Sequence, residues 1–497
     1  MSETLIVLDS LAERRSKYHE ADVVVVGAGV FGCAIAYALA EQGRSVILLE
    51  RWMKEPNRIV GELMQPGGVN SLRKLGLGHC IENIDAVSCN GINVFFYGED
   101  VRMPYPRIQG LLGIDGEKAS KKVDKEDPPL PQGKSFHHGR FITQLRKSCL
   151  SHPNISVFET EVTNTIKGDH NPEILGVETR TTDAATGEKK QDCFFGQLTI
   201  VADGYASRFR KQFIPQTVPV VRSKFYALEL IDCQLPSPGF GHVVIGASSP
   251  VLLYQIGARE TRVLVDVPEK LPEASLANGG VRGYMKNVVL PALPESVQPS
   301  FKAALEKDSK IPQSMPNSWL PPTKQSVPGA VVLGDALNMR HPLTGGGMTV
   351  ALYDVVLLQE LLSPTNIPVL TDTAAVQRAM NTFHWRRKRL TAIINVLAMA
   401  LYSLFAARNQ ELAKLQRGCF HYFKKGITRD PMGMLGGLIP DPLVLAYHFF
   451  SVAFVAIWLD WTTTGLWKVP VLFWNAFWIL WTASVVFLPV MYRELLV

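Results

Sequence analysis

The chain has 497 residues, of which 47% are hydrophobic and 19% charged, a composition that excludes a disordered protein and a length that allows roughly two to four domains. Its net charge of +6 suits an anionic membrane surface or a phosphate-bearing cofactor, and no nucleic-acid partner is expected. The seven cysteines form no CxxC pair and no Cys/His cluster, so neither a disulfide scaffold nor a metal site is predicted.

The first predicted elements are a strand, a helix and a second strand between residues 21 and 50. An unbroken apolar, β-branched run at 22–26 predicts a parallel strand that is buried on both faces. Alanines favour a helix over 33–42, and Gly43 follows as a stop. The second strand is predicted at 45–49 and leads directly into Glu50.

Three glycines, Gly27, Gly29 and Gly32, stand between this strand and helix in a GxGxxG pattern. The first permits a tight turn, the second lets the backbone approach a pyrophosphate, and the third lets helix and strand pack closely. The N-terminus of the helix then offers free N–H groups to the phosphates. Glu50, 18 residues after Gly32, can accept hydrogen bonds from a ribose hydroxyl. These features predict a dinucleotide with an unphosphorylated ribose.

The rest of the chain alternates helix and strand patterns around a polar stretch. Residues 107–134 are rich in Lys, Asp, Gly and Pro and are expected to form a surface insertion. Further elements of the first domain are predicted at 141–150, 157–162, 198–202, 330–333 and 348–362. Strand patterns predict an antiparallel sheet in a second domain, at 225–230, 251–256 and 262–267.

Two later motifs indicate a flavin dinucleotide rather than a nicotinamide one. Asp203-Gly204 follows one predicted strand and Gly334-Asp335 follows another. The carboxylate of Asp335 can hold a ribityl hydroxyl. Gly345 and Gly347 lie in a glycine turn just before a helix, whose N-terminus can face the flavin or its pyrophosphate. A nicotinamide dehydrogenase has no need of this distant second half-site.

From residue 381 onward the chain is helical and more apolar. Two segments, 443–459 and 469–491, carry no charge, and the second is long enough to span a bilayer. Pro470, Asn475 and Pro489 interrupt it, so a hairpin lying in one leaflet fits as well as a span. Aromatic residues typical of membrane interfaces accompany these segments, at Trp458, Trp461, Trp467, Trp474, Trp478 and Trp481. Basic residues at 386–389, 424 and 425 are expected to rest on anionic headgroups.

These motifs together resemble the FAD-dependent aromatic-hydroxylase class of flavoprotein monooxygenases. More narrowly, RIVGE at 58–62, QPGG at 65–68, MRHPLTGGGMT at 339–349 and the apolar tail resemble the squalene monooxygenase (squalene epoxidase) family, in its compact fungal form. The resemblance runs from about residue 22 to the end of the chain. It implies an α/β fold, with a Rossmann-type FAD-binding domain, an antiparallel-sheet substrate domain and a C-terminal helical membrane-associated domain.

The resemblance also implies a set of site residues. Motif and resemblance together assign FAD binding to Gly27, Gly29, Val30, Phe31, Gly32, Glu50, Arg51, Arg58, Arg146, Val162, Asp203, Gly334, Asp335, Gly345, Gly347 and Met348. An apolar substrate pocket is assigned to Ile92, Phe225, Tyr226, Leu253, Tyr254, Pro342 and Leu343. The chemistry belongs to the flavin and oxygen, so no catalytic side chain is predicted.

One position departs from the family pattern. Many members carry a tyrosine where this chain has Ile92, near the flavin and the substrate. A role that depends on that hydroxyl cannot be transferred to this chain. Tyr97 and Tyr105 are candidates to replace it.

The domain organisation follows from the same patterns. Residues 1–20 are an N-terminal extension, and 21–215 with 325–380 form a discontinuous FAD-binding domain that contains the insertion. Residues 216–324 form the substrate domain, and 381–497 form the helical domain.

The resemblance implies that squalene is epoxidised to (3S)-2,3-oxidosqualene with O2, as a step of sterol (in fungi, ergosterol) biosynthesis. Electrons are expected from NADPH through a partner NADPH–cytochrome reductase. The expected location is the endoplasmic reticulum membrane, with lipid droplets as a further site and the catalytic body facing the cytosol, and with membrane lipid as a partner. Family members are also targets of allylamine antifungals.

Three alternatives remain open from the sequence. The first is a membrane-associated flavin hydroxylase of a prenylated aromatic ring, of the ubiquinone-pathway type, which would lack this tail. The second is a non-catalytic flavin-binding paralogue, which Ile92 leaves open. The third is a flavoprotein that reduces alkenes without oxygen.

Overall fold

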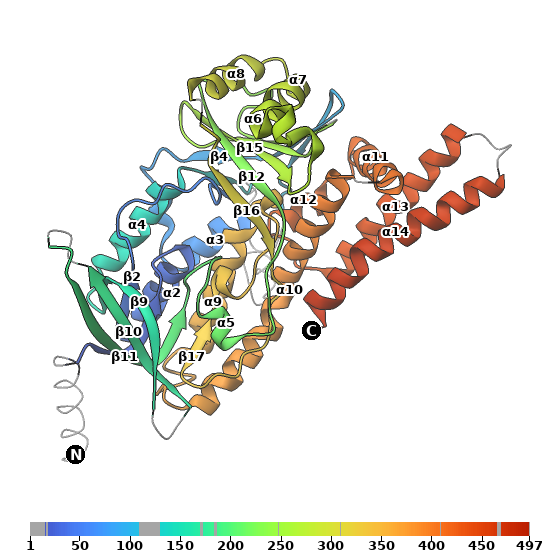
Figure 1. Cartoon of the computed structure of the whole chain (residues 1–497). Coiled ribbons are helices and arrows are strands. Elements are labelled where there is room, and N and C mark those ends of the chain that lie inside the picture. The colour runs from blue at the N-terminus through green and yellow to red at the C-terminus, as the bar shows by residue number, and fades with distance from the viewer. Residues whose placement is uncertain are drawn as a thin grey trace, which may run out of the picture.

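The computed structural model describes residues 15, 18–108, 130–168, 172–182, 186–246, 248–308, 310–407, 409–464 and 469–496. Most of the predicted N-terminal extension and most of the predicted surface insertion lie outside these residues. Figure 1 shows an α/β body from which a pair of long helices projects on one side. The predicted fold class, an α/β flavoprotein with a second sheet and C-terminal helices, is confirmed.

The first sheet contains the predicted dinucleotide-binding strands. Its parallel part has the order β8-β2-β1-β11, and β17 pairs with β11 beyond it. The first half of β11 also pairs antiparallel with β10, and β10 pairs antiparallel with β9. The strands are β1 (Glu20–Val26), β2 (Val46–Glu50), β8 (Ile155–Glu159), β9 (Glu161–Lys167), β10 (Ile174–Thr182), β11 (Lys189–Val201) and β17 (Ala330–Val332).

Helices cover this sheet and create its hydrophobic core. The valines of β1 are fully buried, because helices and strands surround that strand on both faces. The helices are α2 (Val30–Ala40), α3 (Pro66–Lys74), α4 (His138–Leu150) and α9 (Gly347–Leu361). The single strand predicted at 157–162 is wrong. The backbone N–H of Thr160 donates to the carbonyl of Glu50 at the end of the β2–β8 ladder. Strand β8 ends at Glu159, and β9 begins at Glu161 as a separate strand that pairs with β10.

The second sheet has seven strands in the order β16-β12-β15-β14-β13-β5-β6. Two of them, β5 and β6, come from within the segment assigned to the FAD-binding domain, so the chain visits the second sheet before it completes the first. The strands are β5 (Gly91–Phe96), β6 (Glu99–Pro104), β12 (Val220–Ile231), β13 (Gly241–Ile245), β14 (Val251–Gln255), β15 (Glu260–Pro268) and β16 (Ser314–Trp319).

One face of this sheet packs on three short helices that form the top of the molecule in Figure 1, α6 (Gly280–Tyr284), α7 (Leu290–Ala292) and α8 (Gln298–Lys307). A small third sheet consists of β3 (Leu63–Met64), β7 (Gly133–Ser135) and β4 (Val87–Cys89), with β7 in the middle.

Five helices complete the chain: α10 (Thr373–Phe405), α11 (Gln410–Lys424), α12 (Arg429–Leu435), α13 (Pro442–Thr464) and α14 (Val469–Leu495). The proposed boundary between 380 and 381 falls inside α10, a continuous helix of 33 residues. Helix α13 also continues through residues 460–464, beyond the uncharged segment that ends at 459. Of the basic run at 386–389, Arg387 and Lys388 are buried in the body and do not face a membrane.

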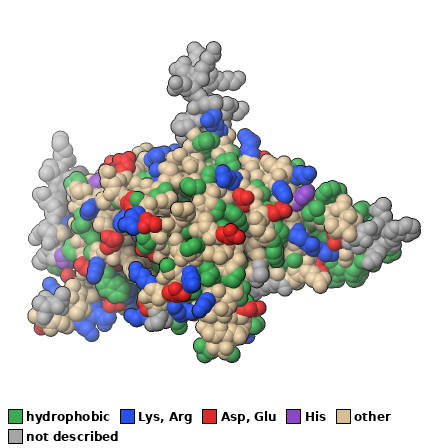
Figure 2. Space-filling view, turned by 90° about the horizontal axis from the view of Figure 1, so that it is seen from above, with side chains coloured by type: hydrophobic (Ala, Val, Ile, Leu, Met, Phe, Trp, Pro, Cys, Tyr) green, Lys and Arg blue, Asp and Glu red, His purple; other side chains and the backbone are tan. Residues whose placement is uncertain are grey.

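Three helices, α10, α13 and α14, are long and apolar enough to cross a membrane. They differ in burial: 78% of the most apolar window of α10 is inside the protein, against 22% for α13 and for α14. Hydrophobic side chains gather at the right end of the molecule in Figure 2, where α13 and α14 lie. The exposed aromatic residues there include five of the six predicted interface tryptophans, Trp458, Trp461, Trp474, Trp478 and Trp481, and Trp467 lies outside the described residues.

The α13/α14 hairpin is attached to the body at both of its ends. Near the turn between the helices, Asp460 pairs with Lys414 of α11 at 2.9 Å. At the other end, the amide of Asn395 on α10 donates to the carboxylate of Glu494 at 2.8 Å, and Glu494 is fully buried. The last turn of α14 is therefore part of the folded body.

Candidate flavin and substrate site

The turn between β1 and α2 has the shape that the glycine spacing predicts. Gly27 has φ +102°, and a Cβ there would lie 2.6 Å from the carbonyl oxygen of Ala202. A Cβ on Gly32 would lie 1.8 Å from the carbonyl oxygen of Gly27, so this position admits only glycine. A Cβ on Gly29 would meet nothing within 4 Å, and no side chain caps the helix at its N-terminus. Backbone N–H groups and open space together make a cradle for a phosphate.

Glu50 lies beside this turn, at the end of β2. Its carboxylate accepts hydrogen bonds from the backbone N–H of Ala28 at 2.8 Å and from that of Trp52 at 3.1 Å. The guanidinium of Arg146 lies 3.4 Å away and donates to the carbonyls of Ala28 and Trp52. Arg146 is buried and braces the turn from behind, so its charge is directed at the backbone and at Glu50.

The residues assigned to FAD also include Arg51, Val162 and Asp203. Arg51 places its guanidinium 3.7 Å above the ring of Trp52, and Val162 is buried in β9. The Asp203 carboxylate receives the backbone N–H of Arg208 on one oxygen, while the other oxygen is buried with no partner among the described residues. Burial raises the pKa of Asp203.

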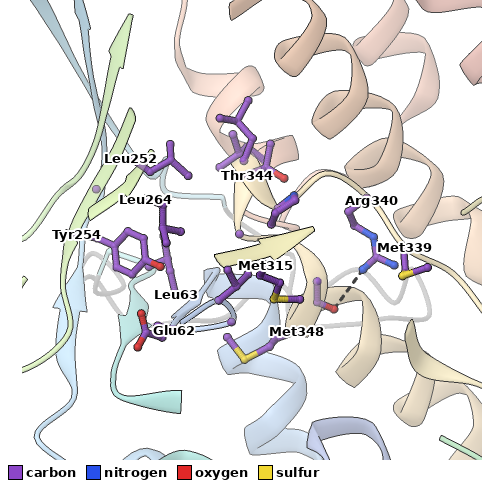
Figure 3. A pocket seen from close by; sticks show the side chains of 18 of the residues that line it. Glu62, Leu63, Leu252, Tyr254, Leu264, Met315, Met339, Arg340, Thr344 and Met348 are labelled. Atoms are coloured by element: carbon purple, nitrogen blue, oxygen red, sulfur yellow. Dashed lines mark hydrogen bonds between the residues drawn. The ribbon is translucent and has the colours of Figure 1, made fainter. Parts of the chain in front are cut away.

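The second glycine motif faces the first. Gly334 has φ +65° and precedes Asp335, whose carboxylate lies 3.9 Å from the guanidinium of Arg58. Both side chains remain about one-third exposed, and both border the cavity described below. Gly345, with φ +61°, leads to the uncapped N-terminus of α9. Figure 3 shows Arg340 reaching the start of this helix, where it donates to the carbonyl of Gly347 at 3.3 Å.

Arg210 joins the two motifs and was missed in the sequence analysis. It begins a short helix, α5 (Arg210–Phe213), and is almost fully buried. Its guanidinium donates to the carbonyls of Ala336 at 2.7 Å and Tyr205 at 2.9 Å, which follow Asp335 and Asp203-Gly204 respectively. The only sequence signal was its position seven residues after Asp203.

A cavity of about 280 Å³ extends from these motifs into the second sheet. Nine of the residues assigned to FAD line it: Gly29, Val30, Phe31, Arg58, Gly334, Asp335, Gly345, Gly347 and Met348. Its opposite wall is apolar and comes from the inner face of the second sheet, with Leu252, Tyr254 and Leu264 side by side in Figure 3. One continuous space thus connects a phosphate cradle to an apolar wall.

Five of the seven residues assigned to the substrate pocket line this cavity: Ile92, Leu253, Tyr254, Pro342 and Leu343. Phe225 and Tyr226 are not among the residues that line it, and their side chains point to opposite faces of the sheet. Phe225 is fully buried beside the 339–349 segment, with its ring 5.5 Å from that of His341. Tyr226 packs with the core on the other face of the sheet.

The C-terminal helices supply part of the wall that the sequence analysis did not assign. These residues come from α10, α11 and α12: Leu397, Leu401, Phe405, Phe423, Pro431, Met432 and Leu435. Their only signal was a general apolar helical pattern, which does not say which face contacts the cavity.

A buried ion pair stands at the edge of the cavity. Glu62, the last residue of the RIVGE segment, receives two hydrogen bonds from the guanidinium of Arg262 on β15, at 2.7 and 2.9 Å. Burial raises the pKa of Glu62, and the hydrogen bonds from Arg262 oppose that rise. The ion pair therefore connects the RIVGE segment, residues 58–62, to the second sheet.

The two tyrosines considered in place of the hydroxyl missing at Ile92 differ sharply. Tyr97 is 68% exposed in the turn between β5 and β6. Tyr105 is buried, and its hydroxyl donates to the side chain of Gln65.

The residues present fit FAD. The open space at Gly29 and the uncapped helix at Gly347 suit phosphate and flavin oxygens, and Glu50 lies where a ribose would be bound. The unpartnered buried oxygen of Asp203 and the buried Nε of Arg58 leave polar atoms for a ligand on the same side of the site.

Family models match most of the chain. The model described as squalene epoxidase matches residues 195–474, and the model described as FAD binding domain matches residues 20–279. Among solved structures, a probable FAD-dependent monooxygenase from Pseudomonas aeruginosa has a TM-score of 0.60 at 19% identity and covers 78% of this chain and 97% of its own. This likeness supports the fold of an FAD-dependent monooxygenase.

Similar proteins cover the chain from end to end. The squalene epoxidase of Gibberella zeae is 58% identical over 99% of both chains. The squalene epoxidase of Aspergillus fumigatus is 53% identical over 98% of this chain and 96% of its own, and the squalene monooxygenase of Mus musculus is 39% identical over 100% of this chain and 82% of its own. The chain therefore belongs to the squalene epoxidase family, in its fungal form, and is a flavoprotein with FAD as its cofactor.

Proposed function

We propose that this protein epoxidises squalene to (3S)-2,3-oxidosqualene, inserting one atom of O2 across a terminal double bond. The observation that carries the proposal is the single cavity that joins the flavin cradle to an apolar wall. The relatives named squalene epoxidase support the same substrate and favour it over a prenylated aromatic ring, over alkene reduction and over a non-catalytic role.

The residues divide the work between holding the cofactor and holding the hydrocarbon. Gly29 and the N-termini of α2 and α9 bind phosphate and flavin, and Arg58 with Asp335 contacts the region between them. Bound FAD supplies the activation of oxygen. Leu252, Leu264 and the α10 side chains exclude water and hold a double bond near the flavin side of the cavity, which limits unproductive loss of activated oxygen.

The cellular setting is proposed from the same family membership. Electrons come from NADPH through an NADPH–cytochrome reductase. This is supported by the sequence, in which the GxGxxG motif at 27–32 suits FAD and no second such motif is present for NADPH. The exposed apolar hairpin supports attachment to the endoplasmic reticulum membrane or to lipid droplets, with the body in the cytosol. The reaction is a step of ergosterol biosynthesis, and allylamines would occupy the same apolar cavity.

The test uses the full chain purified in detergent. It is incubated with squalene, NADPH and a cytochrome reductase, under air and under nitrogen, and products are read by mass spectrometry. We expect a product heavier by one oxygen in air alone. Bound FAD without any oxygenated squalene would contradict the proposal.

A further inference from the structure

A second, smaller cavity of about 60 Å³ lies among the C-terminal helices α10, α11, α12 and α13. Its wall is apolar except for Cys419, Tyr422 and His448. The cavity of about 280 Å³ that holds the flavin and substrate site is called the flavin cavity below. Four residues line both cavities: Leu397, Leu401, Phe423 and Pro431. A single layer of side chains therefore separates the two spaces.

The far wall of the second cavity is formed by one face of α13. Leu445, Phe449 and Val452 recur at helical spacing and line the cavity. The opposite face of the same helix is exposed and apolar, with Tyr447 at 67% and Phe454 at 60% exposure. The thickness of one helix therefore separates the second cavity from the surface that faces a membrane.

A row of polar contacts holds the three outer helices of this cavity together. The hydroxyl of Tyr422 on α11 lies 2.7 Å from Nδ1 of His448 on α13. Nε2 of His448 lies 3.4 Å from a carboxylate oxygen of Asp430 on α12. These contacts fix α13 against α11 and α12 at the place where the helices would have to separate to admit a chain.

We propose that the second cavity binds one end of a linear terpene hydrocarbon on its route between the bilayer and the flavin cavity. Leu401 and Phe423 form the partition that such a chain displaces, and the Tyr422–His448–Asp430 row restores the closed arrangement after it has passed. The proposal rests on the proposed function, because squalene is the hydrocarbon in question. The wall shared with the flavin cavity selects this occupant, since a polyene longer than one cavity needs an apolar path out of the membrane.

The binding site is tested on the full-length holoenzyme in phosphatidylcholine vesicles. The vesicles contain a squalene analogue that carries a diazirine at one end, and labelled peptides are identified by mass spectrometry after illumination. We expect labels on α13 around Leu445 and Val452 as well as on the flavin cavity around Leu252 and Leu264. Labels confined to the flavin cavity would overturn the proposal.

The route is tested by filling the second cavity from two sides. Ala400 and Val452 line this cavity and do not line the flavin cavity. We expect Ala400→Phe and Val452→Phe to lower kcat/KM for squalene in vesicles about tenfold, mainly through KM, and to lose the α13 label while bound FAD is unchanged. Val485→Phe adds the same bulk at an exposed position of α14 that lines neither cavity, and it serves as the matched control with an unchanged kcat/KM.

The two proposals can fail separately. Unchanged kcat/KM in both filled variants would overturn the route, even if the wild-type enzyme makes oxidosqualene. A wild-type enzyme that makes no oxidosqualene, yet is labelled in both cavities, would contradict the proposed function and support the second binding site.

Discussion

The hydroxyl of Tyr105 donates a hydrogen bond of 2.5 Å to Oε1 of Gln65, and Nε2 of Gln65 donates in turn to the carbonyl of Thr344 at 2.7 Å. Both side chains are fully buried. The relay connects the end of β6 to the loop that carries Gly345 and Gly347. Ile92 has no hydroxyl, and Gln65 is held by Tyr105, the residue directly after the neighbouring strand β6.

Tyr105→Phe tests this relay. The variant leaves Oε1 of Gln65 buried without a donor, which costs about 1–3 kcal/mol of the free energy of unfolding. We also expect kcat to fall several-fold while FAD stays bound, because the Thr344 loop loses its support. Thermal unfolding and squalene turnover measure the two effects. Tyr97→Phe, at an exposed position, is the control, and equal behaviour of the two variants would refute the relay.

Two glycines of the same turn should respond differently to alanine. A Cβ at Gly32 would collide with the carbonyl of Gly27, so Gly32→Ala should lower the free energy of unfolding by about 3 kcal/mol. A Cβ at Gly29 meets open space where a pyrophosphate would lie, so Gly29→Ala should fold normally and bind FAD about tenfold more weakly. Unfolding of the apoprotein and FAD titration separate the two. Equal FAD affinity in Gly29→Ala and wild type would disprove the cradle.

Acid should destabilise the protein through His138. Burial, helped by the charge of Arg58, lowers the pKa of His138 from 6.5 to about 3, and its Nδ1 lies 2.8 Å from the carbonyl of Gly61. As the pH falls below 6.5, the unfolded chain binds a proton that the folded chain does not. The stability associated with a neutral His138 is therefore complete above pH 6.5 and decreases by about 1.4 kcal/mol per pH unit toward pH 3.

The measurement is the free energy of unfolding between pH 4 and 8, for wild type and for His138→Gln. The glutamine can keep a donor to Gly61 but does not titrate, so the slope below pH 6.5 should decrease by about one proton. Burial also lowers the pKa of His242, to about 4, so some slope remains in the variant. Superimposable pH profiles would count against this role of His138.

Neighbouring arginines on α10 provide a matched pair. Arg387 is buried and makes two hydrogen bonds with Asp354 of α9, at 2.6 and 3.0 Å, whereas Arg386 pairs with Glu360 at a partly exposed position. Arg387→Met should cost about 3–5 kcal/mol, because it leaves a buried carboxylate unpaired, and adding Asp354→Leu should recover most of that loss. Arg386→Gln should cost no more than about 1 kcal/mol. The free energy of unfolding is measured with denaturant for wild type, Arg387→Met, the double variant and Arg386→Gln. No recovery of stability in the double variant would contradict the prediction.

The part of the site that sequence predicted is the part that local chemistry controls. The glycine turn, Glu50 and the Gly334-Asp335 motif each depend on a few consecutive residues with a particular backbone shape. Their positions followed from spacing alone, and the structure brings Gly29, Gly334 and Gly347 to one cavity.

The part that sequence did not predict depends on contacts between distant segments. Strand β5 pairs in parallel with β13 about 150 residues later, and no local pattern announces that partner. Leu397 and Leu401 read as ordinary apolar helix positions until α10 is placed against the cavity. The choice between Phe225 and Leu252 as lining residues likewise needed the register of β12 and β14 in the second sheet.

The burial of Glu494 against Asn395 has a practical consequence for handling this protein. Truncation before apolar C-terminal helices is a common way to obtain a water-soluble fragment of a membrane-associated enzyme. Here, a chain that ends before α13 would lose Phe487 and Leu445 from the core around α10, and Asn395 would lose the carboxylate of Glu494. Affinity tags are better kept away from the end of α14, where Glu494 is buried. What looks like a detachable anchor is the last structural layer of the enzyme.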